Sequence, residues 1–299
     1  MNICVIGSNG QLGKHILETF KKKNNFFFFS STLKKKPFIN GNFKKPKDLV
    51  NKLKKIKPHV IINCSAYTQV DKAEIEKKDA KIINSDGLKI LSKYCNEDKI
   101  FLIHFSTDYV YSGAGKLPWK EYTKCKPINY YGFSKLEGEK NIVNSKCKYI
   151  IIRLSWLYGK YGNNNFVLKI LQNAKLYKEL NIVSDQFGSP TNTDLVIKVL
   201  KKFLSNIKKK QQYSGIFNLC SNGITSRFEL SHFILKNYLK KKIYENLIIN
   251  KIKTKELKLV ARRPLNSRMN INKISNYLNF KIKNWKFYLK KYLLSVRKI

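Results

Sequence analysis

The side chains of Tyr131 and Lys135 have a spacing that can support proton transfer. They stand four positions apart in the segment 130–144, which has a helical pattern, so a phenol and an ammonium share one face of the expected helix. Tyrosine titrates near ~10, and a fixed positive charge stabilises the phenolate, so we expect Lys135 to lower the pKa of Tyr131. Such a phenol exchanges protons with a substrate oxygen. The spacing alone is weak evidence, because the chain has 17 tyrosines.

Thr107 is a second candidate for the same chemistry. It follows the apolar run 100–105, which has the pattern of a buried strand. Ligands of open parallel sheets bind beyond the carboxyl ends of the strands. We therefore expect the Thr107 hydroxyl to hydrogen-bond the carbonyl oxygen that Tyr131 protonates.

Three glycines follow the first apolar run, 3–6, and precede a helical pattern over 12–20. Glycine at such positions allows a tight turn, a close backbone approach to a ligand and close packing of helix on strand. The free N–H groups at the helix start then bind a diphosphate. Strand, turn and helix together predict a dinucleotide site formed by Gly7, Asn9, Gly10, Gln11, Leu12 and Gly13.

The end of the second expected strand, 26–29, bears on the choice of cofactor. An NAD site usually places Asp or Glu there to bind the ribose 2′-hydroxyl, but no acid occurs between Glu18 and Asp48. Ser30, Ser31 and the lysines of 34–36 are placed to meet a 2′-phosphate instead. We predict NADPH as the cofactor, with NADH as the less favoured alternative. The lysines of 34–36 can equally be solvated.

The elements that must position these residues alternate between strands and helices. Continuous apolar runs separated by helical patterns indicate a parallel sheet covered on both faces. We predict an α/β, doubly wound Rossmann-type sheet, with strands at 3–6, 26–29, 60–63, 100–105 and 149–154 and helices at 12–20, 49–56, 73–94 and 130–144.

The alternation loosens at a Gly/Asn-rich stretch, 159–165. We predict an NADP-binding domain over 1–156 and a smaller α/β, mainly substrate-binding region over 157–299, with one or two segments returning to the main sheet. The elements expected in this region are helices at 166–176, 194–203 and 227–240 and strands at 182–183 and 216–219.

The charge is strongly one-sided, with 60 Lys+Arg against 19 Asp+Glu and a formal net charge of +41. That balance by itself suggests a nucleic-acid or anionic-membrane partner. However, only six of the basic residues are arginines, the residue type that reads bases and phosphates with a bidentate fork. We interpret the lysine excess as compositional bias and predict neither nucleic acid nor membrane as a partner.

The cysteines and the apolar runs bear on the compartment. The six cysteines are far apart, so we expect reduced thiols. No apolar run approaches the ~20 residues that span a bilayer, and the chain opens on an apolar strand without a signal-peptide pattern. We expect a cytoplasmic protein.

Seven runs spread over nearly the whole chain form a distinctive set: 10–13 (GQLG), 63–74 (NCSAYTQVDKAE), 106–110 (STDYV), 131–138 (YGFSKLEG), 153–158 (RLSWLY), 185–191 (DQFGSPT) and 262–268 (RRPLNSR). They resemble the dTDP-4-dehydrorhamnose reductases, which are extended short-chain dehydrogenase/reductases. The resemblance implies NADPH-dependent reduction of the C4 ketone of dTDP-4-dehydro-L-rhamnose to dTDP-L-rhamnose, the last step in making this activated sugar.

The resemblance also implies roles for individual residues. Tyr131 donates the proton as a hydride reaches C4, Lys135 lowers its pKa and orients the ribose, and Thr107 polarises the carbonyl. The positions implied to line the cofactor are Cys64, Ser65, Ala66, Tyr67 and Thr68. Those implied to meet the nucleotide-sugar substrate are Val70, Asp108, Tyr109 and Trp156, with Arg262 and Arg263 toward its diphosphate.

Two departures from the family pattern stand out. Asn42 and Phe43 occupy positions where the family commonly has an Asp-Phe pair, which puts their contacts to the adenine ribose in question. Lys14 and His15 occupy the region where some members carry a glutamate that helps to bridge a dimer through Mg²⁺. We therefore predict no metal, and a monomer or a homodimer.

Other polar residues are expected to be structural. Asp71 and Glu74 begin an expected helix and favour its positive end. Asp185 and Gln186 hold the cleft in shape, and the four histidines, His15, His59, His104 and His232, have no partner pattern.

Two rival functions remain from the sequence. One is a reductase or epimerase of another nucleotide-linked deoxysugar. The other is a non-catalytic regulatory subunit related to the β subunit of methionine adenosyltransferase. The presence of Thr107, Tyr131 and Lys135 together argues against the second.

Overall fold

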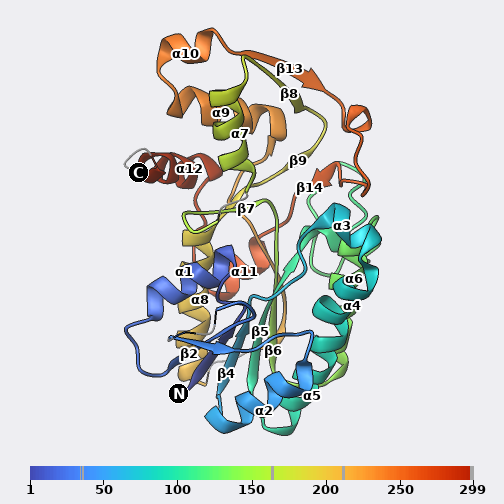
Figure 1. The fold of residues 1–299 in the computed structure, drawn as a ribbon, viewed down its shortest axis with the longest axis vertical. Coiled ribbons are helices and arrows are strands. Elements are labelled where there is room, and N and C mark those ends of the chain that lie inside the picture. The colour runs from blue at the N-terminus through green and yellow to red at the C-terminus, as the bar shows by residue number, and fades with distance from the viewer. Residues whose placement is uncertain (34, 36, 163–164, 211–212, 297–299) are drawn as a thin grey trace.

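The computed structural model describes residues 1–33, 35, 37–162, 165–210 and 213–296. Its centre is a parallel sheet of seven strands in the order β11-β6-β5-β4-β1-β2-β3 (Figure 1). This order, which reverses at β1, is that of a doubly wound Rossmann-type sheet, so the predicted fold class is confirmed. The strands are β1 (Ile3–Ile6), β2 (Phe26–Ser30), β3 (Phe38–Asn40), β4 (Val60–Asn63), β5 (Phe101–Thr107), β6 (Tyr149–Leu154) and β11 (Gly215–Leu219).

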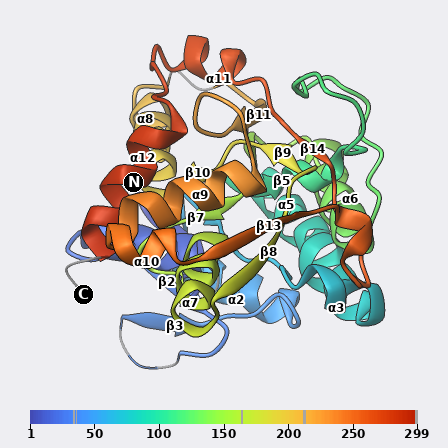
Figure 2. The same cartoon turned by 90° about the horizontal axis from the view of Figure 1, so that it is seen from above.

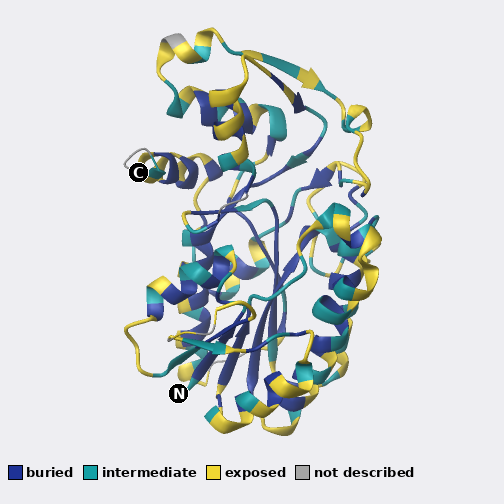
Figure 3. Cartoon of the chain, in the orientation of Figure 1, coloured by how far each residue is buried: buried dark blue, intermediate teal, exposed yellow. Residues whose placement is uncertain are grey.

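Helices cover both faces of the sheet, and the strands between them are buried (Figure 3). Every residue of β1, β4 and β5 is buried, because a strand covered on both faces has no solvent-facing side. One face packs against α1 (Gln11–Phe20), α8 (Thr193–Lys208) and α11 (Asn272–Tyr277), and the other against α2 (Pro46–Ile56), α5 (Gly87–Glu97) and α6 (Tyr130–Asn144).

A smaller group of elements lies beyond the carboxyl ends of the strands (Figures 1 and 2). Its apolar core is formed by α7 (Phe166–Leu176), β8 (Glu179–Val183), α9 (Arg227–Tyr238) and α12 (Trp285–Val296). The chain crosses back to the main sheet with α8, β11 and α11. The domain boundary after residue 156 stays a prediction. The remaining elements here are β7 (Leu157–Tyr158), β9 (Phe187–Gly188), β10 (Thr191–Asn192), β12 (Thr225–Ser226), α10 (Lys241–Glu245), β13 (Ile248–Ile252) and β14 (Asn266–Ser267).

In the described part of the chain, no helix is both long enough and apolar enough to cross a membrane.

The single helix predicted over 73–94 is wrong. The segment forms α3 (Val70–Ile75), α4 (Lys77–Lys81), a π-helical turn (Ile82–Asp86) and α5. Glu76 leaves the helical conformation, with φ −86° and ψ 46°, where its carboxylate accepts a hydrogen bond from the Tyr67 hydroxyl. The π turn lies against α6 at Gly138, where a Cβ would come 2.0 Å from the Asn84 carbonyl oxygen. The break at Glu76 and the π turn therefore allow this segment to pack against the loop after β4 and against α6.

A buried ion pair fixes α6 against the sheet. Arg153 of β6 donates from Nη2 to Glu139 of α6 at 2.6 Å, and from Nη1 to the Tyr111 hydroxyl at 2.8 Å. Both charged side chains are almost completely buried. Tyr131 and Lys135 belong to the same helix as Glu139. The ion pair between Arg153 and Glu139 therefore also fixes the position of Tyr131 and Lys135 relative to the ends of the strands.

Candidate active site

A cavity of about 710 Å³ opens between the carboxyl ends of the strands and the C-terminal elements. Its wall combines the turn before α1, the loop after β4, the end of β5, the start of α6 and the start of α9. Segments far apart in the sequence therefore meet in one site. The predicted residues that line it are Asn9, Gly10, Gln11, Leu12, Cys64, Ala66, Thr68, Val70, Thr107, Asp108, Tyr109, Tyr131, Lys135 and Trp156.

The glycine turn has the geometry of an anion-binding helix start. Gly7 has a φ of +80°, and a Cβ at Gly13 would lie 2.1 Å from the Gly7 carbonyl oxygen, so both positions require glycine. No side chain caps α1, and its first turn contains no acid. Its first N–H groups are thus available to an anionic ligand, which fits the diphosphate of a dinucleotide. Gly7 and Gly13 shape this turn without lining the cavity.

Tyr131 and Thr107 meet at the floor of the cavity. The Thr107 side chain interacts with the Tyr131 hydroxyl, and the Thr107 hydroxyl donates a hydrogen bond to Asp108 at 3.2 Å. The Tyr131 ring also contacts Tyr109 edge-on, with centroids 5.6 Å apart. Desolvation raises the pKa of Tyr131, and the phenolate charge of Tyr131 is further opposed by Asp108. The expected lowering of the pKa of Tyr131 is therefore wrong, because burial outweighs the opposite effect of the Thr107 side chain.

Lys135 is directed into the interior rather than into solvent. Its Nζ donates to the Phe105 carbonyl oxygen at 2.8 Å and lies 3.0 Å from Nε2 of His104. Burial lowers the pKa of Lys135 to about 8. His104, which the sequence indicated only as structural, thus touches a proposed catalytic side chain.

Asp108 lies beside Thr107 and is almost completely buried. This burial raises the pKa of Asp108 to about 6, although Thr107, Ser267 and the charge of Arg227 act in the opposite direction. The cavity wall therefore carries a carboxyl group that titrates near neutral pH.

Arg227, at the start of α9, is a site residue that sequence reasoning missed. Its guanidinium lies over the ring of Trp156 at 3.7 Å and over that of Phe166 at 4.4 Å, and it lines the cavity. Among the described residues it has no carboxylate within ion-pair distance. A stacked, unpaired cation in a cavity is suited to an anionic ligand. The only sequence signal was the rarity of arginine in a lysine-rich chain.

Comparison with known proteins agrees with this geometry. The family model described as RmlD substrate binding domain matches residues 1–298. The dTDP-4-dehydrorhamnose reductase of Escherichia coli is 33% identical over 298 residues, covering 98% of this chain and 97% of the relative. A crystal structure of the enzyme from Bacillus anthracis in complex with NADP has a TM-score of 0.86 and 29% identity, covering 98% of this chain and 99% of that one. The ortholog from Clostridium acetobutylicum has a TM-score of 0.87 and 30% identity over the full length of both chains.

The chain belongs to the dTDP-4-dehydrorhamnose reductase family.

The structure places several expected site residues of this dTDP-4-dehydrorhamnose reductase family member away from the cavity. Ser30 is buried and accepts hydrogen bonds from the N–H groups of Thr32 and Leu33, while Ser31 is exposed. Phe43 is a core residue packed against Gly87, and Asn42 accepts from the Lys44 N–H. Ser30, Ser31, Asn42, Phe43, Ser65 and Tyr67 do not line the cavity. Of the lysines at 34–36, positions 34 and 36 lie outside the described residues.

The arginine pair at 262 and 263 lines a second cavity and not the first. Arg263 forms an ion pair with Asp71, whose N-terminal position in α3 was expected to serve the helix alone. The Arg262 carbonyl oxygen accepts from Asn129, the residue that caps α6. In this family member, these residues therefore connect the C-terminal loop to α3 and to the start of α6.

Other polar residues have structural partners. Asp185 accepts from the N–H and hydroxyl of Thr254, and Gln186 donates to the same hydroxyl. His15 contacts Thr193 and Asp194. In the described part of the chain, no group of three or more His, Cys, Asp or Glu side chains is arranged to hold a metal ion.

Proposed function

We propose that this protein reduces the C4 ketone of dTDP-4-dehydro-L-rhamnose to dTDP-L-rhamnose with NADPH. The observation that carries the proposal is that the Thr107 and Tyr131 side chains lie together in a cavity that also contains the open helix start of α1. Family membership and the names of the relatives support the same substrate.

NADPH, when bound, supplies the hydride that reaches C4. The backbone of the glycine turn and Gln11 hold the diphosphate of the dinucleotide, and Ala66 and Thr68 line its path beyond β4. Tyr131 donates its proton to the ketone oxygen as the carbon is reduced, so the carbonyl becomes a secondary alcohol. Thr107 hydrogen-bonds the same oxygen and polarises it. In its protonated form, Lys135 supplies positive charge to the resulting phenolate.

The nucleotide sugar requires a cation for its own diphosphate. Arg227 faces the cavity, whereas Arg262 and Arg263 do not line it, so we assign this role to Arg227. Trp156, which stacks on Arg227, borders the sugar. An indole face beside a sugar ring is well suited to its apolar side.

The preference for NADPH over NADH is part of the proposal. The absence of an acid between Glu18 and Asp48 supports it, and the relative from Bacillus anthracis was crystallised with NADP. Comparable kcat/KM values with the two cofactors would contradict it.

The decisive experiment follows NADPH absorbance with dTDP-4-dehydro-L-rhamnose and compares the natural protein with Tyr131→Phe. We expect the variant to lose about a hundredfold or more in kcat, because it lacks the acidic proton, while its affinity for NADPH is retained. Tyr130→Phe is the matched control, since Tyr130 lies on the same helix and its ring contacts Phe133.

Each outcome of this comparison has a clear meaning. An undiminished rate in Tyr131→Phe would remove Tyr131 as the acid. Turnover of another dTDP- or UDP-linked 4-keto sugar, without turnover of this substrate, would favour the rival deoxysugar reductase. Absence of NADPH binding and turnover would favour a non-catalytic role.

The proposal also includes the cellular compartment and the oligomeric state in which the protein acts. All six cysteines are free thiols in the structure, which fits the reducing cytoplasm. We propose that the protein acts there as a monomer or homodimer, with its cofactor region within 1–156 and its substrate region mainly within 157–299.

A further inference from the structure

Three buried polar side chains form a chain that ends on Lys135. Asn63 ends β4, His104 lies beside it in β5, and Lys135 reaches them from α6. The amide nitrogen of Asn63 lies 3.0 Å from Nδ1 of His104, and Nε2 of His104 lies 3.0 Å from Nζ of Lys135. All three residues are at most 1% exposed. Their hydrogens must therefore be shared among themselves and the neighbouring backbone.

The orientation of the Asn63 amide follows from its other contact. The Ser65 N–H donates to Oδ1 of Asn63 at 3.0 Å, so this end of the amide is the oxygen. The other end is the NH₂ group, which can only donate. It faces Nδ1 of His104, and this ring nitrogen must therefore accept and carry no hydrogen.

A neutral imidazole with an unprotonated Nδ1 carries its hydrogen on Nε2. The hydrogen of His104 then points at Nζ of Lys135. An ammonium group has three donors and no lone pair, so it cannot accept this N–H, whereas a neutral amine can. The second contact of Nζ, the Phe105 carbonyl oxygen, can be satisfied by either form.

Burial leaves His104 neutral. It lowers the pKa of His104 well below its usual range, and Lys135 lowers it further whenever its amine is protonated. For Lys135, burial lowers the pKa, while Glu139 of α6 and Cys64 after β4 act in the opposite direction. His104 of β5 is a third titratable group that faces Nζ.

We propose that Asn63 and His104 act as positioning residues for Lys135: Asn63 fixes His104 as the Nε2–H tautomer, and this N–H favours the amine of Lys135 over the ammonium. The proposal rests on the role of Lys135 in the proposed function. Its consequence there is that Lys135 can gain and lose a proton within the working pH range. The hydrogen bond from the Ser65 N–H to Asn63 connects the protonation state of Lys135 to the loop after β4, part of which lines the cofactor path.

The tautomer can be measured directly in the protein without substrate or cofactor. Histidine labelled with ¹⁵N is observed by long-range ¹H–¹⁵N correlation between pH 6 and 9, and the signals of His104 are identified by their loss in His104→Gln. We expect a protonated Nε2 and an unprotonated Nδ1 across this range. A protonated Nδ1, or a ring that becomes cationic above pH 6, would overturn the proposal. If His104→Gln does not fold, single variants of His15, His59 and His232 identify the remaining signals by elimination.

A second measurement tests the effect on Lys135. In His104→Gln the side-chain oxygen can turn toward Nζ and accept from the ammonium, so we expect the limb of the kcat–pH profile that reports Lys135 to move upward by about one unit, a tenfold change in the proton equilibrium. Asn63→Asp should convert His104 to the Nδ1–H tautomer in the NMR spectrum and move the same limb upward. A fall in kcat with an unmoved profile would show a merely structural role and overturn the proposal. Because the NMR arm needs no turnover, it remains informative if the proposed substrate is not reduced.

Discussion

At the level of single residues, the cavity is lined by Arg227, together with Lys14 and Lys135, and not by the arginine pair at 262 and 263. The sequence pointed to Arg262 and Arg263 as the diphosphate-binding residues because both lie in one of the seven runs that resemble the family. Arg227 acquires its environment only when α9 packs beside Trp156 and Phe166, which are distant from it in the chain. By contrast, Thr107, Tyr131 and Lys135 could be predicted, because strand-end position and helical spacing are local properties.

Substitution of Arg227 tests the assignment of the diphosphate. Arg227→Gln should raise KM for the nucleotide sugar by roughly 10- to 100-fold, as expected for loss of a charged hydrogen bond, and leave KM for NADPH nearly unchanged. Steady-state kinetics with each substrate varied in turn provides the measurement. Arg268→Gln is the matched control, because Arg268 also stacks on an aromatic ring, Phe187, but does not line the cavity. Equal effects of the two substitutions would contradict the assignment.

Because the pKa of Asp108 is raised in the folded protein, we expect the free energy of unfolding to depend on pH. Burial raises the pKa of Asp108 to about 6, above the ~3.9 of an unfolded chain. The folded state therefore favours the protonated carboxyl, and the stability that it contributes is complete below about pH 4 and is lost as the pH rises through 6. Relative to the natural protein, Asp108→Asn should gain about 3 kcal/mol in the free energy of unfolding between pH 4 and pH 8. Urea unfolding at both pH values measures this gain, and no change between them would refute the prediction.

At the level of elements, the central strands could be predicted because they are buried on both sides and read as unbroken apolar runs. The interrupted helix over 73–94 could not, since the break at Glu76 depends on a contact from Tyr67 and the π turn on the approach of Gly138. The strand β13 was also missed. It lies at the surface beside β8 and lacks an apolar run, so pairing rather than composition defines it.

Substitution by alanine should have different effects on stability and on cofactor binding at two glycines near the start of α1. Gly13→Ala brings a Cβ against the Gly7 carbonyl oxygen, so helix and strand must separate and the free energy of unfolding should fall by at least ~2 kcal/mol. Gly10→Ala meets only the Gly7 carbonyl oxygen, at 3.6 Å, and should keep the fold while weakening NADPH binding, because the methyl group intrudes where the diphosphate approaches. Thermal unfolding and cofactor titration of both variants separate the two effects. A stable Gly13→Ala protein would disprove the packing argument.

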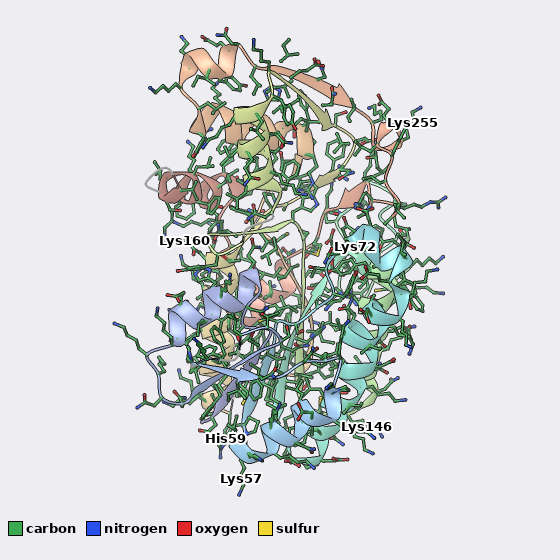
Figure 4. The ribbon with its side chains drawn as sticks, viewed as in Figure 1. Lys57, His59, Lys72, Lys146, Lys160 and Lys255 are labelled. Carbon is green, nitrogen blue, oxygen red and sulfur yellow. The ribbon has the colours of Figure 1, made fainter. Side chains whose placement is uncertain are left out.

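At the level of the whole molecule, exposed lysines occur on several segments that are far apart in the chain. Five of them, Lys57, Lys72, Lys146, Lys160 and Lys255, are labelled in Figure 4. With a formal net charge of +41, the molecule has a net positive field.

This field should accelerate capture of anionic substrates. Raising the ionic strength from ~0.05 to ~0.5 M should lower kcat/KM for the nucleotide sugar several-fold while kcat stays nearly constant. Salt screens the electrostatic attraction that brings substrate and protein together, but it does not affect the chemical step. Assays in NaCl and in potassium acetate distinguish screening from competition by a particular anion. A kcat/KM that is independent of salt would show that the surface lysines do not contribute to capture.

The return of α8 and β11 to the main sheet also affects how the protein is made. Six of the seven strands have been synthesised by residue 154, but the face of the sheet that packs against α1 lacks the rest of its cover until Leu195, Val199 and Phe203 of α8 follow. The strand β6 likewise has an unpaired edge until β11 is complete at Leu219. A ribosome-bound chain that has just finished β6 therefore presents both a partly uncovered apolar face and an open strand edge, two features that promote aggregation. The interval between residues 154 and 219 is consequently the vulnerable period of its biosynthesis, and a pause in translation there would lengthen that exposure.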